Sequence, residues 1–318
     1  MLTKLRQTIL RGVDPILGFT YDGPEDLVLA PDEVLSDGLI WIGDRASAGP
    51  RVGVLGGSTS DISYEGSWLR PLRDVGKERG RPLSLISGAV SGYASSQELI
   101  KLTRDLLPAQ PTVVVNLNGV NDLGFIQAGD RSHPSIHSYQ LRLFRFLVSV
   151  YGGNRGARSL WNKVAARGGM RPPAMNDELK LGGMHLGYPS TATPAAHWYR
   201  NVRMCRAICA EFGVPYVAFL QPIMGIGNYQ LNAEETEYHE GYLKEHPGLH
   251  GVPYHEAAET FYAEARNFVA RHPDFMVDLV DVFQGHQGVF SDSRHPNERG
   301  YRILAEAIFE NLRARNCI

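Results

Sequence analysis

Residues 51–60 read RVGVLGGSTS, an apolar run that ends in Gly56 and Gly57 and is followed by Ser58. The apolar run predicts a buried strand over residues 51–55, and the glycines allow a tight turn directly after it. Open α/β sheets bind ligands outside the carboxyl ends of their strands, so the Ser58 hydroxyl is a candidate functional group. A glycine-rich turn with a capping serine is the alternative. A dinucleotide-binding turn is disfavoured, because the G-x-G-x-x-G spacing and the phosphate-loop lysine are absent.

Short apolar runs alternate with longer amphipathic segments along the rest of the chain. The runs predict further strands at residues 83–86, 112–117, 216–220 and 276–282. The amphipathic segments predict helices near residues 68–79, 96–107, 195–212, 255–271 and 297–314. This alternation is typical of a parallel sheet built from βαβ crossovers. We therefore predict a three-layer α/β/α sandwich with a parallel five-stranded sheet, flavodoxin-like in its winding.

Two regions do not follow this alternation. Residues 1–50 include Pro15, Pro24 and Pro31 in a loosely spaced acidic context, which predicts an N-terminal extension wrapping the core. Residues 129–190 contain several glycine and proline pairs between short apolar patches. Long irregular segments inside a compact domain are usually functional, so we predict a cap or lid insertion over the site at about 129–190. The main domain is then residues 51–318.

Composition narrows the class of protein. Of 318 residues, 43% are hydrophobic and 21% charged, which is ordinary for a soluble globular chain. A net charge of −2 does not suggest the basic surface that a nucleic-acid partner requires. No signal-peptide core or membrane span is visible, so a cytoplasmic protein is expected. The three cysteines cannot build a disulfide framework; Cys205 and Cys209 are predicted to be buried, with half of a metal site as the alternative.

A second motif, Asp292-Ser293-Arg294-His295-Pro296-Asn297, lies just before the predicted last helix. A histidine oriented by a carboxylate is the general base that a serine needs, because a free hydroxyl is a poor nucleophile at neutral pH. His295 and Asp292 are therefore candidates for base and orienting acid. Alternative bases near the last strand are His272 and His286, and alternative acids are Asp278 and Asp281.

Two more strand ends carry suitable groups. The sequence Asn118-Gly119-Val120-Asn121-Asp122 follows the run at 112–117, and Ser91-Gly92-Tyr93 follows the run at 83–86. Both could be simple turns. As functional groups, the Asn121 amide and the Gly92 backbone N–H could donate to a developing oxyanion.

Taken together and in this order, the four motifs resemble the SGNH hydrolases, also called the GDSL esterase/lipase family. Gly56-Gly57-Ser58-Thr59 is similar to the first block, Gly92 to the second-block glycine, and Gly119-x-Asn121-Asp122 to the third block. Asp292-x-x-His295 is similar to the last block. The resemblance covers residues 51–128 and 215–312. One departure is Ser87, where the family often has an asparagine ahead of the second-block glycine.

The resemblance implies ester hydrolysis through an acyl-enzyme, with Ser58 as nucleophile, His295 as base and Asp292 as its orienting acid. Ser58, Gly92 and Asn121 would hold the oxyanion, and no metal or organic cofactor is required. An O-acyltransferase would use the same residues. A non-catalytic carbohydrate-binding protein on the same fold is a third reading, disfavoured because every catalytic residue type is present.

The substrate prediction rests on the insertion. Its longest apolar stretch is residues 143–150, which is too short to form the continuous apolar surface that a long acyl chain would need. Polar and aromatic residues predict a hydroxyl-rich partner instead, an acetylated carbohydrate or another small polar ester. They are Arg155, Arg158, Trp161, His197, Trp198 and Tyr199. For Trp198 and Tyr199 the alternative is packing into the core, which is more common for aromatic residues on a helix. Gln221 and Pro222, after the fourth predicted strand, are expected to shape the floor of the site.

Overall fold

The computed structural model describes residues 14, 17, 20, 21, 27–45, 49–63, 66–123, 192–245 and 252–318. The predicted cap at 129–190 lies outside the described residues, and so does most of the chain before residue 27.

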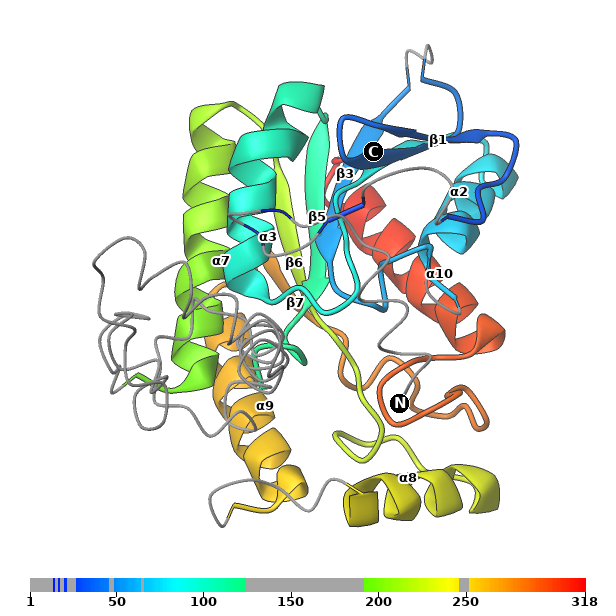
Figure 1. The fold of residues 1–318 in the computed structure, drawn as a ribbon, viewed down its shortest axis with the longest axis vertical. Coiled ribbons are helices and arrows are strands. Elements are labelled where there is room, and N and C mark those ends of the chain that lie inside the picture. Colours follow the sequence, from blue (N-terminus) through cyan, green and yellow to red (C-terminus); the bar gives the residue numbers. More distant parts are fainter. Residues whose placement is uncertain are drawn as a thin grey trace, which may run out of the picture. The chain divides into compact units, whose positions relative to one another are not determined.

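A seven-stranded sheet lies at the centre, in the order β1-β2-β4-β3-β5-β6-β7 (Figure 1). Neighbouring strands from β4 to β7 pair in parallel, whereas β1 with β2, and β2 with β4, pair antiparallel. Numbered along the chain, the five parallel strands have the flavodoxin-like order 2-1-3-4-5. The strands are Glu33–Ser36, Leu39–Ile42, Arg51–Gly56, Ser84–Ser87, Val113–Asn118, Tyr216–Leu220 and Met276–Asp278.

The prediction of a five-stranded, all-parallel sheet was therefore wrong in two respects: the sheet is seven-stranded, and it is mixed. The two extra strands form a hairpin inside the predicted N-terminal extension. Asp37 and Gly38 connect them with φ angles of 55° and 70°. Positive φ at both central residues is the requirement of a type I′ turn, which Asp-Gly satisfies best. The predicted last strand, 276–282, ends at Asp278.

Six α-helices accompany the sheet in the described residues. They are α2 (Leu69–Glu78), α3 (Ser95–Lys101), α7 (Pro194–Glu211), α8 (Ala233–Glu245), α9 (Tyr254–Arg271) and α10 (Glu298–Ala314). Helix α3 continues through a π-helical segment, Leu102–Leu106, and a 3₁₀ turn, Leu107–Ala109. Helix α8 was not predicted from the sequence, because Glu235 is its one buried residue and the helix has no apolar face. None of the described helices has the length and apolarity that crossing a membrane requires.

Helices cover both faces of the sheet because successive strand residues point to opposite sides. In β5, Val113, Val115 and Leu117 pack with α2 and α10 in one core cluster. Val114, between them, belongs to a second cluster with α3, α7 and α9. Figure 1 shows these two helical layers on either side of the strands. The parallel strands are buried on both faces, and their carboxyl ends carry the loops described below.

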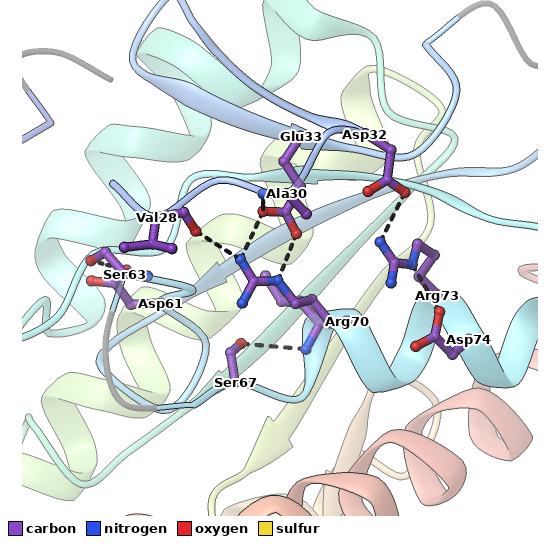
Figure 2. A network of polar contacts seen from close by, with 11 residues as sticks. Val28, Ala30, Asp32, Glu33, Asp61, Ser63, Ser67, Arg70, Arg73 and Asp74 are labelled. Atoms are coloured by element: carbon purple, nitrogen blue, oxygen red, sulfur yellow. Dashed lines mark hydrogen bonds and ion pairs between the residues drawn. The ribbon is translucent and has the colours of Figure 1, made fainter. Parts of the chain in front are cut away.

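The hairpin segment is also fastened to α2 by ion pairs (Figure 2). Arg70 donates two hydrogen bonds to the Glu33 carboxylate, at 2.7 and 2.8 Å, and a third to the Val28 carbonyl at 3.0 Å. Arg73 bonds Asp32 at 2.8 Å. Burial raises the pKa of Glu33, but the hydrogen bonds from Arg70 and from the Ala30 N–H outweigh it, so the net pKa is lowered. The residues before β1 are thus bound to the core.

Candidate active site

The loops at the carboxyl ends of four parallel strands carry the residues singled out in the sequence. Ser58 follows β3, Gly92 follows β4, and Asn121 follows β5. Asp292 and His295 lie in the long connection between β7 and α10. Because β3 lies between β4 and β5 in the sheet, these three loops are neighbours at one edge.

Ser58, His295 and Asp292 form a continuous hydrogen-bonded line. Ser58 Oγ lies 2.7 Å from His295 Nε2, and His295 Nδ1 lies 2.7 Å from Asp292 Oδ2. The His295 side chain is 12% exposed and that of Asp292 is 48% exposed. The nucleophile, base and orienting-acid geometry of a serine hydrolase requires these two contacts.

The Asp-x-x-His spacing has a local structural cause. Asp292 Oδ1 accepts the backbone N–H groups of Arg294 at 2.7 Å and His295 at 2.8 Å. An aspartate that bonds the backbone two and three residues ahead closes a tight turn. The turn leaves Oδ2 facing the ring of His295, so one carboxylate both shapes the loop and orients the imidazole.

The Asp292 carboxyl is held ionised by these contacts. Burial raises its pKa, but the hydrogen bond and charge of His295 and the backbone N–H groups outweigh burial, and the net pKa is lowered. A carboxylate that stays charged next to an imidazole favours the imidazolium that forms when the ring accepts a proton.

Gly92 has a backbone conformation that favours glycine. Its φ angle is +90°, which L side chains rarely adopt. Within the described part of the chain, no acceptor pairs with the backbone N–H of Gly92 or of Ser58. Both groups are therefore free to donate to a substrate.

Asn121 is held beside Ser58 by the neighbouring loop. Its Nδ2 donates one hydrogen bond to the Tyr93 carbonyl at 2.8 Å, which leaves the second N–H of the amide. A Cβ on Gly57 would lie 2.2 Å from Asn121 Nδ2, so the amide occupies the space that a side chain at position 57 would take. The glycine next to Ser58 is thus required for the close approach of Asn121.

The structure places the alternative residues elsewhere. His272 is hydrogen-bonded through Nε2 to the Tyr199 hydroxyl. Asp278 and Asp281 each form an ion pair with Arg266 at 2.6 Å. No side-chain hydrogen bond joins His286 to a residue that the structure describes. The histidine next to Ser58 is therefore His295.

The aromatic residues expected to line a sugar site are placed differently. Trp198 is fully buried in the core, where its Nε1 donates to Asn118 Oδ1 at 2.7 Å, and His197 is buried beside it. Tyr199 stacks on Phe268 with ring centroids 4.2 Å apart. The expectation for Trp198 and His197 was wrong, because the helix turns these side chains toward the sheet. Arg155, Arg158 and Trp161 lie outside the described residues.

Gln221 and the two cysteines also have defined environments. Gln221 is buried, and its Nε2 donates to the Arg294 carbonyl at 3.4 Å, so it contacts the backbone of the Asp292–His295 turn. Cys205 and Cys209 are buried, and burial raises the pKa of both thiols, that of Cys209 to about 12. No cluster of three metal-ligating side chains occurs among the described residues.

Sequence reasoning missed a buried polar network beneath the site. Asp122, next to Asn121, accepts hydrogen bonds from the backbone N–H and the hydroxyl of Ser95 at the start of α3. Glu98, one turn further along, accepts from the amides of Asn116 and Asn118 at the end of β5. Burial raises the pKa of Asp122 to about 7 and of Glu98 to about 8. Asp122 could have been found from its place in the third motif; Glu98 has no sequence signal.

No family model matches the chain, and a search of curated proteins finds no match. Solved structures match most of it at low identity. A lipase/acylhydrolase from Enterococcus faecalis is 13% identical with a TM-score of 0.45, over 84% of this chain and 96% of that one. An acetyl xylan esterase is 14% identical with a TM-score of 0.47, over 82% and 99%.

A third match is a GDSL-like lipase from Bacteroides thetaiotaomicron, 14% identical with a TM-score of 0.42, over 83% of this chain and 88% of that one. Likenesses this distant decide neither the reaction nor the substrate of this chain.

Proposed function

We propose that this protein is a serine ester hydrolase of the SGNH type that works through an acyl-enzyme. The observation that carries the proposal is the line Ser58–His295–Asp292, with 2.7 Å at both contacts. The contact between Ser58 and His295 joins residues 237 positions apart in the chain. Ser58 lies on a turn at the carboxyl edge of the sheet and is half-buried, so a substrate can reach its hydroxyl. A serine with a purely structural role would not need this exposure.

The reaction follows from the positions of these atoms. Ser58 Oγ attacks the ester carbonyl carbon while its proton passes to His295 Nε2. Asp292 stabilises the imidazolium. His295 then gives the proton to the leaving alcohol oxygen, and the acyl group stays on Ser58. Water attacks the acyl-enzyme with the same proton transfers and releases the acid.

The oxyanion of each tetrahedral intermediate is assigned to three donors: the backbone N–H groups of Ser58 and Gly92 and the side-chain N–H of Asn121. The first two have no acceptor among the described residues, and the third has one N–H left. Loss of one such donor commonly costs about 10²- to 10³-fold in kcat. The proposal needs no metal, so incubation with a chelator is expected to leave turnover unchanged.

The substrate we propose is a small polar ester carrying a short acyl group, with an acetylated carbohydrate as the leading candidate. The support is the sequence of residues 129–190, which lacks a long continuous apolar stretch. An O-acyltransferase would use the same residues, with a sugar hydroxyl in place of water as acceptor. Measuring free acid against transferred acyl group in the presence of a sugar separates the two.

The test compares the wild-type chain with Ser58→Ala and, as a matched loss of one hydroxyl far from the site, Ser36→Ala in β1. Hydrolysis of p-nitrophenyl acetate and labelling by a fluorophosphonate are measured, with circular dichroism and melting as folding controls. Ser58→Ala is expected to lose turnover and labelling and to keep its fold. Retention of more than about a tenth of the rate would remove Ser58 from the nucleophile role.

A further inference from the structure

The Asp61 carboxylate, three residues after Ser58, is fully buried and joins several segments. Its Oδ1 accepts the backbone N–H of Ser63 at 2.9 Å and the Ser63 hydroxyl at 2.6 Å. Its Oδ2 accepts the backbone N–H of Ser91 at 2.6 Å. The Tyr21 hydroxyl donates a further hydrogen bond to Oδ1. A buried carboxylate is costly unless donors surround it, so these contacts stabilise one another.

The contact with Ser91 acts on the loop that carries Gly92. Ser91 is the residue immediately before Gly92, and its N–H is held by Asp61. On the other side, the Tyr93 carbonyl accepts from Asn121, and the Tyr93 N–H bonds the Val90 carbonyl at 3.0 Å. Gly92 thus lies between two anchored residues, and the direction of its N–H depends on both anchors.

Tyr21 links this arrangement to the segment before the sheet. Its side chain is 6% exposed, and its hydroxyl also lies 3.1 Å from the Ala89 carbonyl, in the same loop as Ser91. A second contact comes from Leu17, whose carbonyl accepts from Gln97 Nε2 at 2.7 Å in the first turn of α3. The N-terminal segment therefore contacts the loop between β4 and α3 through Tyr21 and the first turn of α3 through Leu17.

We propose that Asp61 and Tyr21 form a brace that positions the Gly92 N–H for the oxyanion. The proposal rests on the proposed ester hydrolysis and adds to it two residues that act through Ser91 and Ala89. Neither is a catalytic residue, because neither touches the reacting atoms. Both are positioning residues, and one of them comes from the N-terminal extension, outside the four motifs.

The kinetic test uses the full chain with Tyr21→Phe and Asp61→Asn, and p-nitrophenyl acetate as substrate. The matched control is Glu33→Gln, which weakens the other attachment of the same segment, to Arg70 on α2 (Figure 2). Rates are divided by the number of sites that a fluorophosphonate labels at completion. Misfolded molecules are not labelled, so they do not affect the rate per labelled site.

The brace predicts that kcat per labelled site falls about 10-fold in Tyr21→Phe and about 100-fold in Asp61→Asn, since a small misplacement of a catalytic group can cost about 10²-fold. The KM and the pH at the midpoint of the activity profile stay unchanged, because the Ser58–His295 pair is intact. Glu33→Gln keeps the wild-type kcat. Wild-type kcat per labelled site in Tyr21→Phe would overturn the brace and leave ester hydrolysis standing.

Amide hydrogen exchange provides a readout that does not need turnover. The Ser91 N–H is hydrogen-bonded, so a peptide covering residues 88–94 should exchange faster in both variants than in the wild type, while residues 33–42 are unchanged. Equal exchange in all three proteins would overturn the brace even if the enzyme is active. Absence of both turnover and labelling in the wild type would instead refute the proposed function, and with it the catalytic role of the brace. Tyr21→Phe removes one oxygen atom, so the test holds even if Asp61→Asn does not fold.

Discussion

Asp292 and His295 are joined twice: Asp292 Oδ1 accepts the backbone N–H of His295 at 2.8 Å, and Asp292 Oδ2 lies 2.7 Å from its ring Nδ1. The first contact closes the turn and the second orients the ring. Both oxygens of one carboxylate are used, so a single side chain fixes the backbone of the turn and the orientation of the imidazole. Substitutions at Asp292 can therefore separate loop geometry from proton transfer.

Asp292→Asn is expected to keep the turn and lose most of the activity. The asparagine oxygen can still accept the backbone N–H groups, but its NH₂ would face Nδ1 and favour the tautomer that places a hydrogen on Nε2, toward Ser58. The ring then cannot accept the serine proton, and kcat should fall by about 10⁴-fold.

His295→Ala should lower kcat at least as much as Asp292→Asn. Steady-state kinetics measure both, with His286→Ala as the matched control; collapse in that control beside normal turnover in His295→Ala would transfer the base to His286.

The pH dependence should show a single ionisation on the acidic side. The lowered pKa of Asp292 keeps this carboxylate charged over the whole range in which a histidine titrates. The value of kcat/KM should therefore rise with unit slope as one histidine loses its proton, and remain high in mild base. A profile of log kcat/KM against pH measures this. A slope of two on the acidic limb would mean that a second group must also ionise.

Gly57→Ala should remove activity at little cost in stability. The new methyl would lie 2.2 Å from Asn121 Nδ2 and 3.3 Å from the Tyr93 carbonyl oxygen, so the amide has to move away while the backbone has to shift by only a few tenths of an ångström. Loss of one oxyanion donor predicts a fall in kcat of about 100-fold. Gly241→Ala in α8 is the control, because its added Cβ meets nothing within 4 Å. Kinetics and urea denaturation of both variants measure the effect; wild-type kcat in Gly57→Ala would remove Asn121 from the site.

Glu98→Gln should stabilise the protein at alkaline pH. Burial raises the pKa of Glu98 from 4.5 to about 8, so the folded state keeps a proton that the unfolded state has lost. Stability is then lost as the pH rises from about 4.5 to about 8, by at most about 1.4 kcal/mol per pH unit for this group. Glutamine resembles the protonated acid, and its NH₂ could donate to Asn116 Oδ1, which has no partner among the described residues.

The free energy of unfolding at pH 5, 6.5 and 8 tests this expectation by urea denaturation. The variant should lose less stability than the wild type between pH 5 and 8, and exposed Glu237→Gln on α8 should behave like the wild type. Parallel loss in Glu98→Gln and wild type would show that this carboxyl is ionised in the folded state at neutral pH.

Acyl-chain preference should favour the shortest esters. The proposed short-acyl site would gain little of the roughly 0.8 kcal/mol that each buried CH₂ can contribute. The value of kcat/KM for p-nitrophenyl esters should be highest for acetate or propionate and decline beyond about six carbons. Acetylated sugars extend the series. Faster turnover of octanoate or longer chains would contradict the short-acyl proposal and favour a lipase.

Much of the candidate site could be predicted from the sequence because its causes are local. A strand that runs into Gly56 and Gly57 places Ser58 at the sheet edge, and the Asp292 turn follows from a three-residue spacing. The alternation of apolar runs predicted the five parallel strands. The Asp37-Gly38 pair is also typical of a hairpin turn. The hairpin was not predicted, because its four-residue strands are short and lie among prolines and acidic residues.

The sequence by itself determined the elements and the turns, since backbone propensity and side-chain periodicity act over a few residues. Only the tertiary structure decided which loops meet. Ser58 and His295 are 237 positions apart, and the order of strands in the sheet, not the spacing, brings their atoms to 2.7 Å. The same holds for Tyr21 beside Asp61 and for Trp198, whose burial depends on the face of α7 that packs on the sheet. Such contacts depend on packing between distant segments, which local residue patterns do not encode.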